Sequence, residues 1–130
     1  HPTFAWDFQS LGYEGSLYRA NVIDAGDIAR LRQDIEKDLG PVDGFIVNAT
    51  PAQPLKPIEE YDWDFYQSMI DFFIKSPYLL TREFLPHMRQ QKWGRIINIA
   101  SEVFTRGVAP FSAYVAAKGG QIGWTRRFSM

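Results

Sequence analysis

Two short apolar runs on either side of a long helical segment limit most strongly what this chain can fold into. The first is the unbroken run Phe45-Ile46-Val47, and the second is the segment from Gly94 to Ala100, in which Arg95 and Asn98 interrupt the apolar residues. An unbroken apolar run of this length is typical of a strand that helices bury on both faces. Strands that alternate with helices pair in parallel, so the pattern predicts an α/β protein with a parallel sheet.

The region before the first run is expected to contribute one strand and one helix. A short strand is predicted over residues 16–22. Asp24 or Asp27 is suited to cap a helix, because a short carboxylate side chain can accept hydrogen bonds from the first free N–H groups. Apolar residues follow at helical spacing up to Leu39, and Gly40-Pro41 then ends the helix.

The region after the first run is expected to be a proline-containing loop and then a long helix over residues 63–90. Acidic residues gather where this helix begins, which favours the positive end of the helix dipole. Pro77 and Pro86 lie inside the helical pattern, and each is expected to cause a kink or a break. A last helix is predicted over residues 112–127.

Length and charge narrow the functions that the chain can have. Its 130 residues are enough for a single domain, 1–130. With 14 Lys and Arg against 15 Asp and Glu, it lacks the basic excess that nucleic acids or anionic membranes require. There is no cysteine, and His1 and His87 have no partner ligands at metal spacing, so no metal site is predicted. No apolar run is long enough to span a bilayer and no targeting segment is visible, which favours a cytoplasmic location.

One constellation of side chains is suited to proton transfer. Tyr114 and Lys118 are four residues apart on a predicted helix, so their side chains share one face. A neighbouring ammonium favours the phenolate form of a tyrosine, which lets the pair move a proton near neutral pH. Ser101 stands just beyond the second predicted strand, at the sheet edge where α/β proteins bind ligands. Its hydroxyl can donate a hydrogen bond to a substrate oxygen.

With these residues the sequence resembles the short-chain dehydrogenase/reductase family, from about Ser16 to Met130. The matching segments are Asn21-Val22 with Asp24, Val47 to Thr50, Leu85 to Met88, Gly94 to Ser101, and Tyr114 to Lys118. The resemblance implies a doubly wound, Rossmann-like parallel sheet. It also implies hydride transfer between NAD or NADP and an alcohol or carbonyl substrate.

The resemblance also implies roles for single residues. Tyr114 would be the general acid or base and would, with Lys118, also contact the cofactor. Lys118 would favour the phenolate and bind the ribose hydroxyls of the nicotinamide, and Ser101 would position the substrate oxygen. Asn48 and Ala49 would lie along the adenosine side of the cofactor and Asn21 near the adenine. Helices 63–90 and 112–127 would form the interface of a homodimer or homotetramer.

Three departures from the family pattern matter. Phe73 stands where the family commonly has an asparagine that supports a proton relay to the lysine; Ser76, one turn on, is a partial substitute. No glycine-rich turn precedes Ser16, and the later strands have no counterpart. The resemblance therefore predicts an incomplete three-layer α/β fragment that lacks the first βαβ unit and the C-terminal strands.

The substrate and two alternative functions stay open at this point. An apolar loop over residues 102–113 suggests a hydrophobic or acyl-type substrate. One alternative is a non-catalytic, truncated relative that acts as a dimerising partner. The other is a dehalogenase-type lyase on the same scaffold, although such relatives have arginine where this chain has Lys118.

Overall fold

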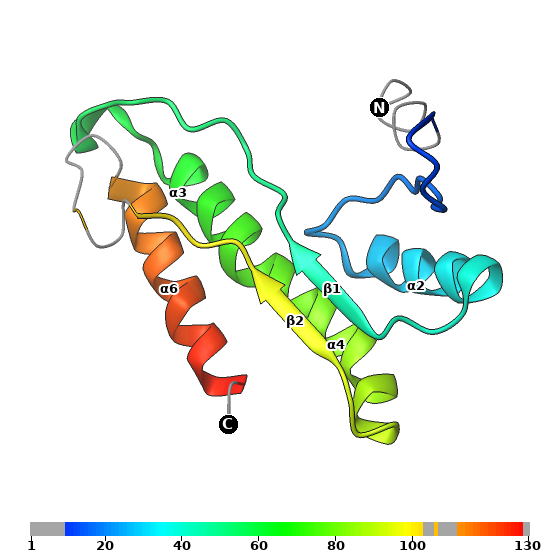
Figure 1. The fold of residues 1–130 in the computed structure, drawn as a ribbon. Helices are drawn as coiled ribbons and strands as arrows, with labels where there is room; N and C mark the ends of the chain where they lie inside the picture. Colours follow the sequence, from blue (N-terminus) through cyan, green and yellow to red (C-terminus); the bar gives the residue numbers. More distant parts are fainter. Residues whose placement is uncertain (1–9, 103–105, 107–111, 129–130) are drawn as a thin grey trace.

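The computed structural model describes residues 10–102, 106 and 112–128. Its helices are α2 (Ala25–Leu39), α3 (Trp63–Ile70), α4 (Ser76–Gln90) and α6 (Ser112–Phe128). A 3-10 turn, η1 (Ile58–Glu60), precedes α3, and a π-helical segment, η2 (Asp71–Lys75), joins α3 to α4. Two strands, β1 (Gly44–Val47) and β2 (Arg95–Asn98), complete the described elements (Figure 1).

The two predicted strands pair with each other in parallel, as the sequence predicts. Gly44 lies opposite Arg95, and Val47 lies opposite Asn98. Phe45 packs on Phe84 of α4, with 5.7 Å between the ring centres. The chain therefore forms a βαβ unit in which the long helical segment covers the sheet.

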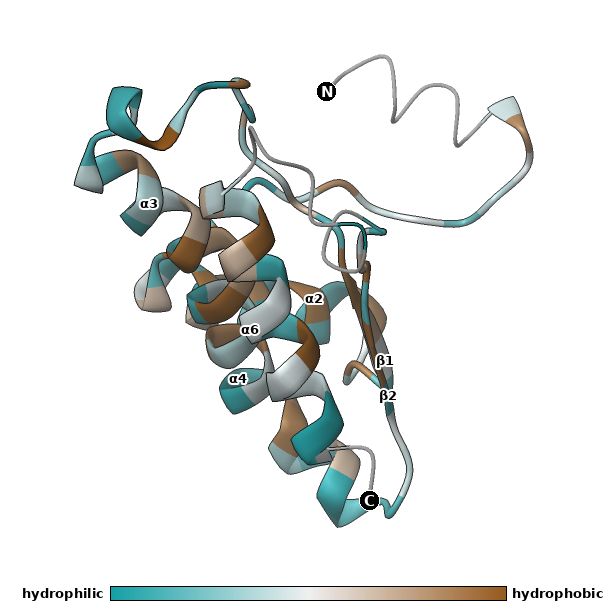
Figure 2. Cartoon of the chain, turned by 90° about the vertical axis from the view of Figure 1, so that its left-hand side faces the viewer, coloured by the Kyte–Doolittle hydropathy of each residue, from teal (hydrophilic) through white to brown (hydrophobic). Residues whose placement is uncertain are grey.

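Only one face of this sheet is covered by the described helices. Figure 2 shows the two strands edge-on, with α4 and α6 on one side of them. The side chains that point the other way, Ile46 and Ile97, are 61% and 48% exposed. Apolar side chains on both faces are typical of a sheet that helices cover on both sides. The described residues thus form two of the three predicted layers.

The predicted strand over residues 16–22 is wrong. Residues 13–21 have no regular secondary structure, and a turn follows at Val22 and Ile23. A strand exists only where a neighbouring strand pairs with its backbone. The sheet of the described residues consists of β1 and β2 alone, so this segment has no ladder to join.

Pro77 and Pro86 have different effects on the long helix. A proline cannot donate a backbone hydrogen bond. At Pro77 the expected interruption is present, because α3 passes into the π-helical segment η2, where the Ser76 N–H donates to the Asp71 carbonyl. At Pro86 the helix does not break, because α4 continues to Gln90, and a kink there stays a prediction. Pro86 and Arg82, whose carbonyl loses its donor, are both exposed, so water can supply the missing hydrogen bond.

The main buried cluster lies between α3, η2 and α6. It consists of Met69, Phe73, Ala113 and Ala117, with Tyr114 packed against it. Asn98 also donates a hydrogen bond from β2 to the Thr125 hydroxyl of α6, at 2.8 Å. These contacts fix the face of α6 that bears Tyr114 and Lys118 against the end of the sheet.

Some predictions lie outside the described residues. The apolar residues Phe104, Val108, Pro110 and Phe111 of the substrate loop belong to this group, as does His1. Of the helices that the structure describes, none has the length and apolar character to cross a membrane. Within 10–102, 106 and 112–128, no three His, Asp or Glu residues come together in a way that could bind a metal ion.

Candidate active site

A cavity of about 110 Å³ lies at the carboxyl ends of β1 and β2. Its lining includes four of the residues predicted for the site, namely Asn48, Ala49, Tyr114 and Lys118. The other residues that line it are Val47, Thr50, Gln53, Phe73, Ile99, Ala100 and Gln121. The fold thus brings Asn48 and Ala49 close to Tyr114 and Lys118, which lie 65 or more positions further along the chain. Parallel sheets bind ligands at this edge.

A larger cavity of about 590 Å³ lies elsewhere. It extends along β2 from Gly94 and Arg95 and is also lined by Trp93 and Trp124. None of the predicted site residues lines it. We assign the chemistry to the smaller cavity, because proton-transfer groups are present there.

Lys118 is the most constrained charged group of the site. It is 5% exposed, and its Nζ donates hydrogen bonds to the Ile99 carbonyl, at 2.6 Å, and to Gln121 Oε1, at 3.1 Å. The Ile99 bond ties α6 to the end of β2. Burial lowers the pKa of Lys118, because an ammonium loses hydration free energy when it leaves water.

Phe73 and Tyr114 form the aromatic side of the site. The Lys118 Nζ lies 4.2 Å from the centre of the Phe73 ring and 5.8 Å from the centre of the Tyr114 ring. The two rings meet edge to face, with 5.3 Å between their centres. Phe73 offers no hydrogen-bonding group, but its π face attracts the ammonium. The residue that departs from the family pattern therefore contacts both Tyr114 and Lys118.

Ser76 does not form the relay that its position suggests. Its side chain is fully buried, and its hydroxyl has no hydrogen-bond partner among the described residues. It also lies outside the lining of the cavity. The partial substitution for the relay asparagine therefore has no support from the contacts that the structure describes.

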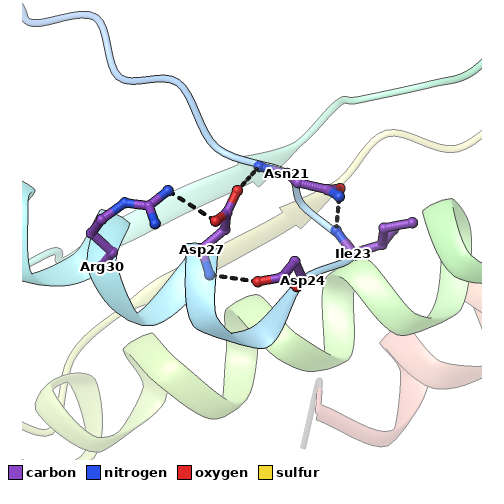
Figure 3. A network of polar contacts seen from close by, with 5 residues as sticks. All are labelled: Asn21, Ile23, Asp24, Asp27 and Arg30. Atoms are coloured by element: carbon purple, nitrogen blue, oxygen red, sulfur yellow. Dashed lines mark hydrogen bonds and ion pairs between the residues drawn. The ribbon is translucent and has the colours of Figure 1, made fainter.

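Asn21 lies apart from the cavity, in a network at the N-terminus of α2 (Figure 3). Its N–H donates to Asp27 Oδ2 at 2.8 Å, and its side-chain oxygen accepts from the Ile23 N–H at 3.2 Å. Asp24 caps the helix by accepting from the Asp27 N–H at 2.8 Å. The carboxylates of Asp24 and Asp27 lie together at this helix start, and their negative charge disfavours a cofactor phosphate there. The adenine contact of Asn21 stays a prediction.

Ser101 adjoins the cavity without lining it. It follows Ala100, which is a lining residue, and it is half-buried. Its predicted role, a hydrogen bond to the substrate oxygen, stays a prediction.

Gln121 is a site residue that the sequence reasoning missed. It is 1% exposed, lines the cavity and accepts a hydrogen bond from Lys118. The signal for it was its spacing, because position 121 is three residues after Lys118 and seven after Tyr114, on the same helix face.

A parallel βαβ unit with polar residues at the carboxyl ends of its strands is typical of ligand-binding α/β proteins, of which the Rossmann-like proteins are one class. A family model described as short chain dehydrogenase matches residues 3–130. The chain therefore belongs to the short-chain dehydrogenase family of oxidoreductases.

Individual relatives agree with this family. The chain is 35% identical over 116 residues to D-beta-hydroxybutyrate dehydrogenase of Cupriavidus necator, covering 89% of this chain and 43% of the relative. It is 34% identical over 106 residues to the NAD(+)-linked 2-dehydro-3-deoxy-L-rhamnonate dehydrogenase of a Sphingomonas species, covering 82% and 43%. It is 30% identical over 122 residues to a 3-oxoacyl-acyl-carrier-protein reductase of Staphylococcus aureus, covering 92% and 48%. The chain thus spans slightly less than half the length of these relatives.

Proposed function

We propose that this chain provides the proton-transfer site of an oxidoreductase that moves a hydride between NAD or NADP and an alcohol or carbonyl substrate. The observation that carries the proposal is the buried Lys118 ammonium beside Tyr114, in a cavity with further polar side chains. Family membership and the NAD(+) in the name of one relative support it.

The residues of the cavity fit one part of such a cofactor. The Lys118 ammonium has three protons and donates two hydrogen bonds within the protein. The remaining proton is suited to a ribose hydroxyl, and Asn48, Thr50 and Gln53 add polar groups. About 110 Å³ is far less than the ~300–1,000 Å³ of a typical ligand pocket. The cavity therefore suits the sugar beside the nicotinamide and not a whole dinucleotide.

The chemistry divides between the cofactor and the protein. The nicotinamide, when bound, takes or gives the hydride. In oxidation of an alcohol, the Tyr114 oxygen takes the hydroxyl proton, and in reduction of a carbonyl it gives the proton back. Lys118 stabilises the phenolate and binds the ribose hydroxyls, and Ser101 donates a hydrogen bond to the substrate oxygen. Asn48 and Ala49 adjoin the adenosine side.

Assembly and substrate class belong to the same proposal. Trp63 is an exposed aromatic side chain on α3, within the helical segment 63–90 that is predicted to form a homodimer or homotetramer interface with α6. A cytoplasmic location is part of the same proposal. Two of the relatives act on a 3-hydroxy acid and a 3-oxoacyl group, as their names state, so compounds of this kind are the first substrates to test.

Substitution of Lys118 with Met tests the cofactor contact in the intact protein. Calorimetric titration with NAD and with NADP is expected to show affinity for at least one of them. The Lys118→Met substitution weakens this affinity by roughly 10- to 100-fold, because it removes hydrogen bonds from a charged donor. Lys75→Met, which removes an exposed lysine of η2, is the matched control and leaves the affinity unchanged. Equal affinity in the Lys118 and Lys75 variants contradicts the proposal.

A further inference from the structure

The Lys118 ammonium is contacted by two side chains, Phe73 and Gln121, and Phe73 stands where the family commonly has an asparagine. Phe73 lies 4.2 Å from the ammonium and has no hydrogen-bonding group. The Gln121 Oε1 accepts from Lys118 at 3.1 Å, and the Gln121 side chain is 1% exposed. A buried amide is costly unless its polar atoms find partners, so this contact has a physical reason to persist.

The surroundings of Lys118 contain few charged or titratable groups. No ion pair joins Lys118 to a carboxylate of the described residues. From its own helix, Tyr114 is the titratable group that faces it, η2 contributes the Phe73 ring, and the end of β2 contributes the Ile99 carbonyl. We therefore expect the Gln121 hydrogen bond to have a direct effect on the pKa of Lys118.

We propose that Gln121 is a positioning residue for Lys118. Its amide oxygen accepts a hydrogen bond from one ammonium N–H, and the Ile99 carbonyl accepts from a second. The Phe73 ring limits where the Nζ can lie. The third proton is thereby directed to the cavity. The consequence for catalysis rests on the proposed function, whereas the hydrogen bond itself does not.

The test follows the titration of Lys118 in the intact protein by NMR of lysines labelled at 13Cε, with the signal assigned from its loss in Lys118→Arg. Gln121→Met keeps the length of the side chain and removes the acceptor. We expect it to lower the pKa of Lys118, with a roughly tenfold rise in the acid dissociation constant, because the charged form loses a hydrogen bond. Gln121→Glu is expected to raise the pKa, because a carboxylate favours the ammonium. Gln90→Met, at the exposed end of α4, is the matched control and leaves the titration unchanged.

The outcomes are separable from those of the cofactor experiment. A Lys118 titration in Gln121→Met that is the same as in wild type overturns the proposal. If Gln121→Met does not fold, Gln121→Glu decides alone, and an unchanged titration in that variant is the overturning result. Failure of Lys118→Met to weaken dinucleotide binding would contradict the proposed function and leave this NMR result as it stands.

Discussion

Replacing Tyr114 with Phe is expected to lower the turnover number of the intact protein by about 10²- to 10⁴-fold, the usual contribution of a general acid or base. The substitution removes one oxygen and keeps the ring. The edge-to-face contact with Phe73 and the packing against the buried cluster are therefore retained. The loss is predicted to fall on turnover and not on dinucleotide affinity, because the hydroxyl acts on the substrate oxygen.

The measurement is the rate of NAD(P)-dependent turnover, with 3-hydroxybutyrate and a 3-oxoacyl thioester as first substrates. Tyr78→Phe is the control, because this tyrosine is exposed on α4 and lies outside the cavity. It is expected to keep wild-type turnover. If Tyr114→Phe turns over as fast as Tyr78→Phe, the assignment of Tyr114 as the proton-transfer group is wrong.

Replacing Phe73 with Ala is expected to give the largest loss of stability, about 3–5 kcal/mol in the free energy of unfolding. Phe73 is 2% exposed and belongs to the buried cluster with Met69, Ala113 and Ala117. Removing its ring leaves a void between η2 and α6. The ring also faces the Lys118 ammonium, so its loss takes away a cation–π contact as well.

Urea unfolding followed by circular dichroism measures the stability change, and Phe73→Leu separates its two causes. Leucine refills much of the space and has no π face. We expect Phe73→Leu to recover most of the stability and to lower the pKa of Lys118, because the ammonium loses the attraction of the ring. Similar losses of stability in Phe73→Ala and in Tyr78→Ala, which truncates an exposed aromatic of α4, would show that the cluster is not the core of the fold.

The sequence predicts the elements whose stability depends on local signals or on a nearby partner. Asp24 caps α2 because a short carboxylate can reach a free N–H, which a sequence pattern reveals. The strands β1 and β2 are predictable because both lie in the chain and pair with each other. The segment 16–22 is not, because a strand depends on a neighbour, and its composition alone does not tell whether one is there.

The part of the candidate site that can be predicted from the sequence is the set of residues that lie at helical spacing on one helix. Tyr114 and Lys118 share a face because they are four residues apart. Contacts between distant segments are different, and the approach of Phe73 to Lys118 depends on how η2 packs on α6. The sequence indicates an interruption near Pro77, but not that it takes a π-helical form. Gln121 is on the predictable face and was missed because a glutamine is more often a solvated residue.

We propose that Lys118 binds the cofactor, with Tyr114 beside it, in the cavity at the ends of β1 and β2. NMR of the intact protein, with lysines labelled at 13Cε and tyrosines labelled in the ring, tests it most directly during a titration with NAD or NADP. We expect the signals of Lys118 and Tyr114 to shift with saturation, while those of Lys75 and Tyr78 stay in place. Signals of Lys118 and Tyr114 that do not move at millimolar concentrations of either dinucleotide would contradict it.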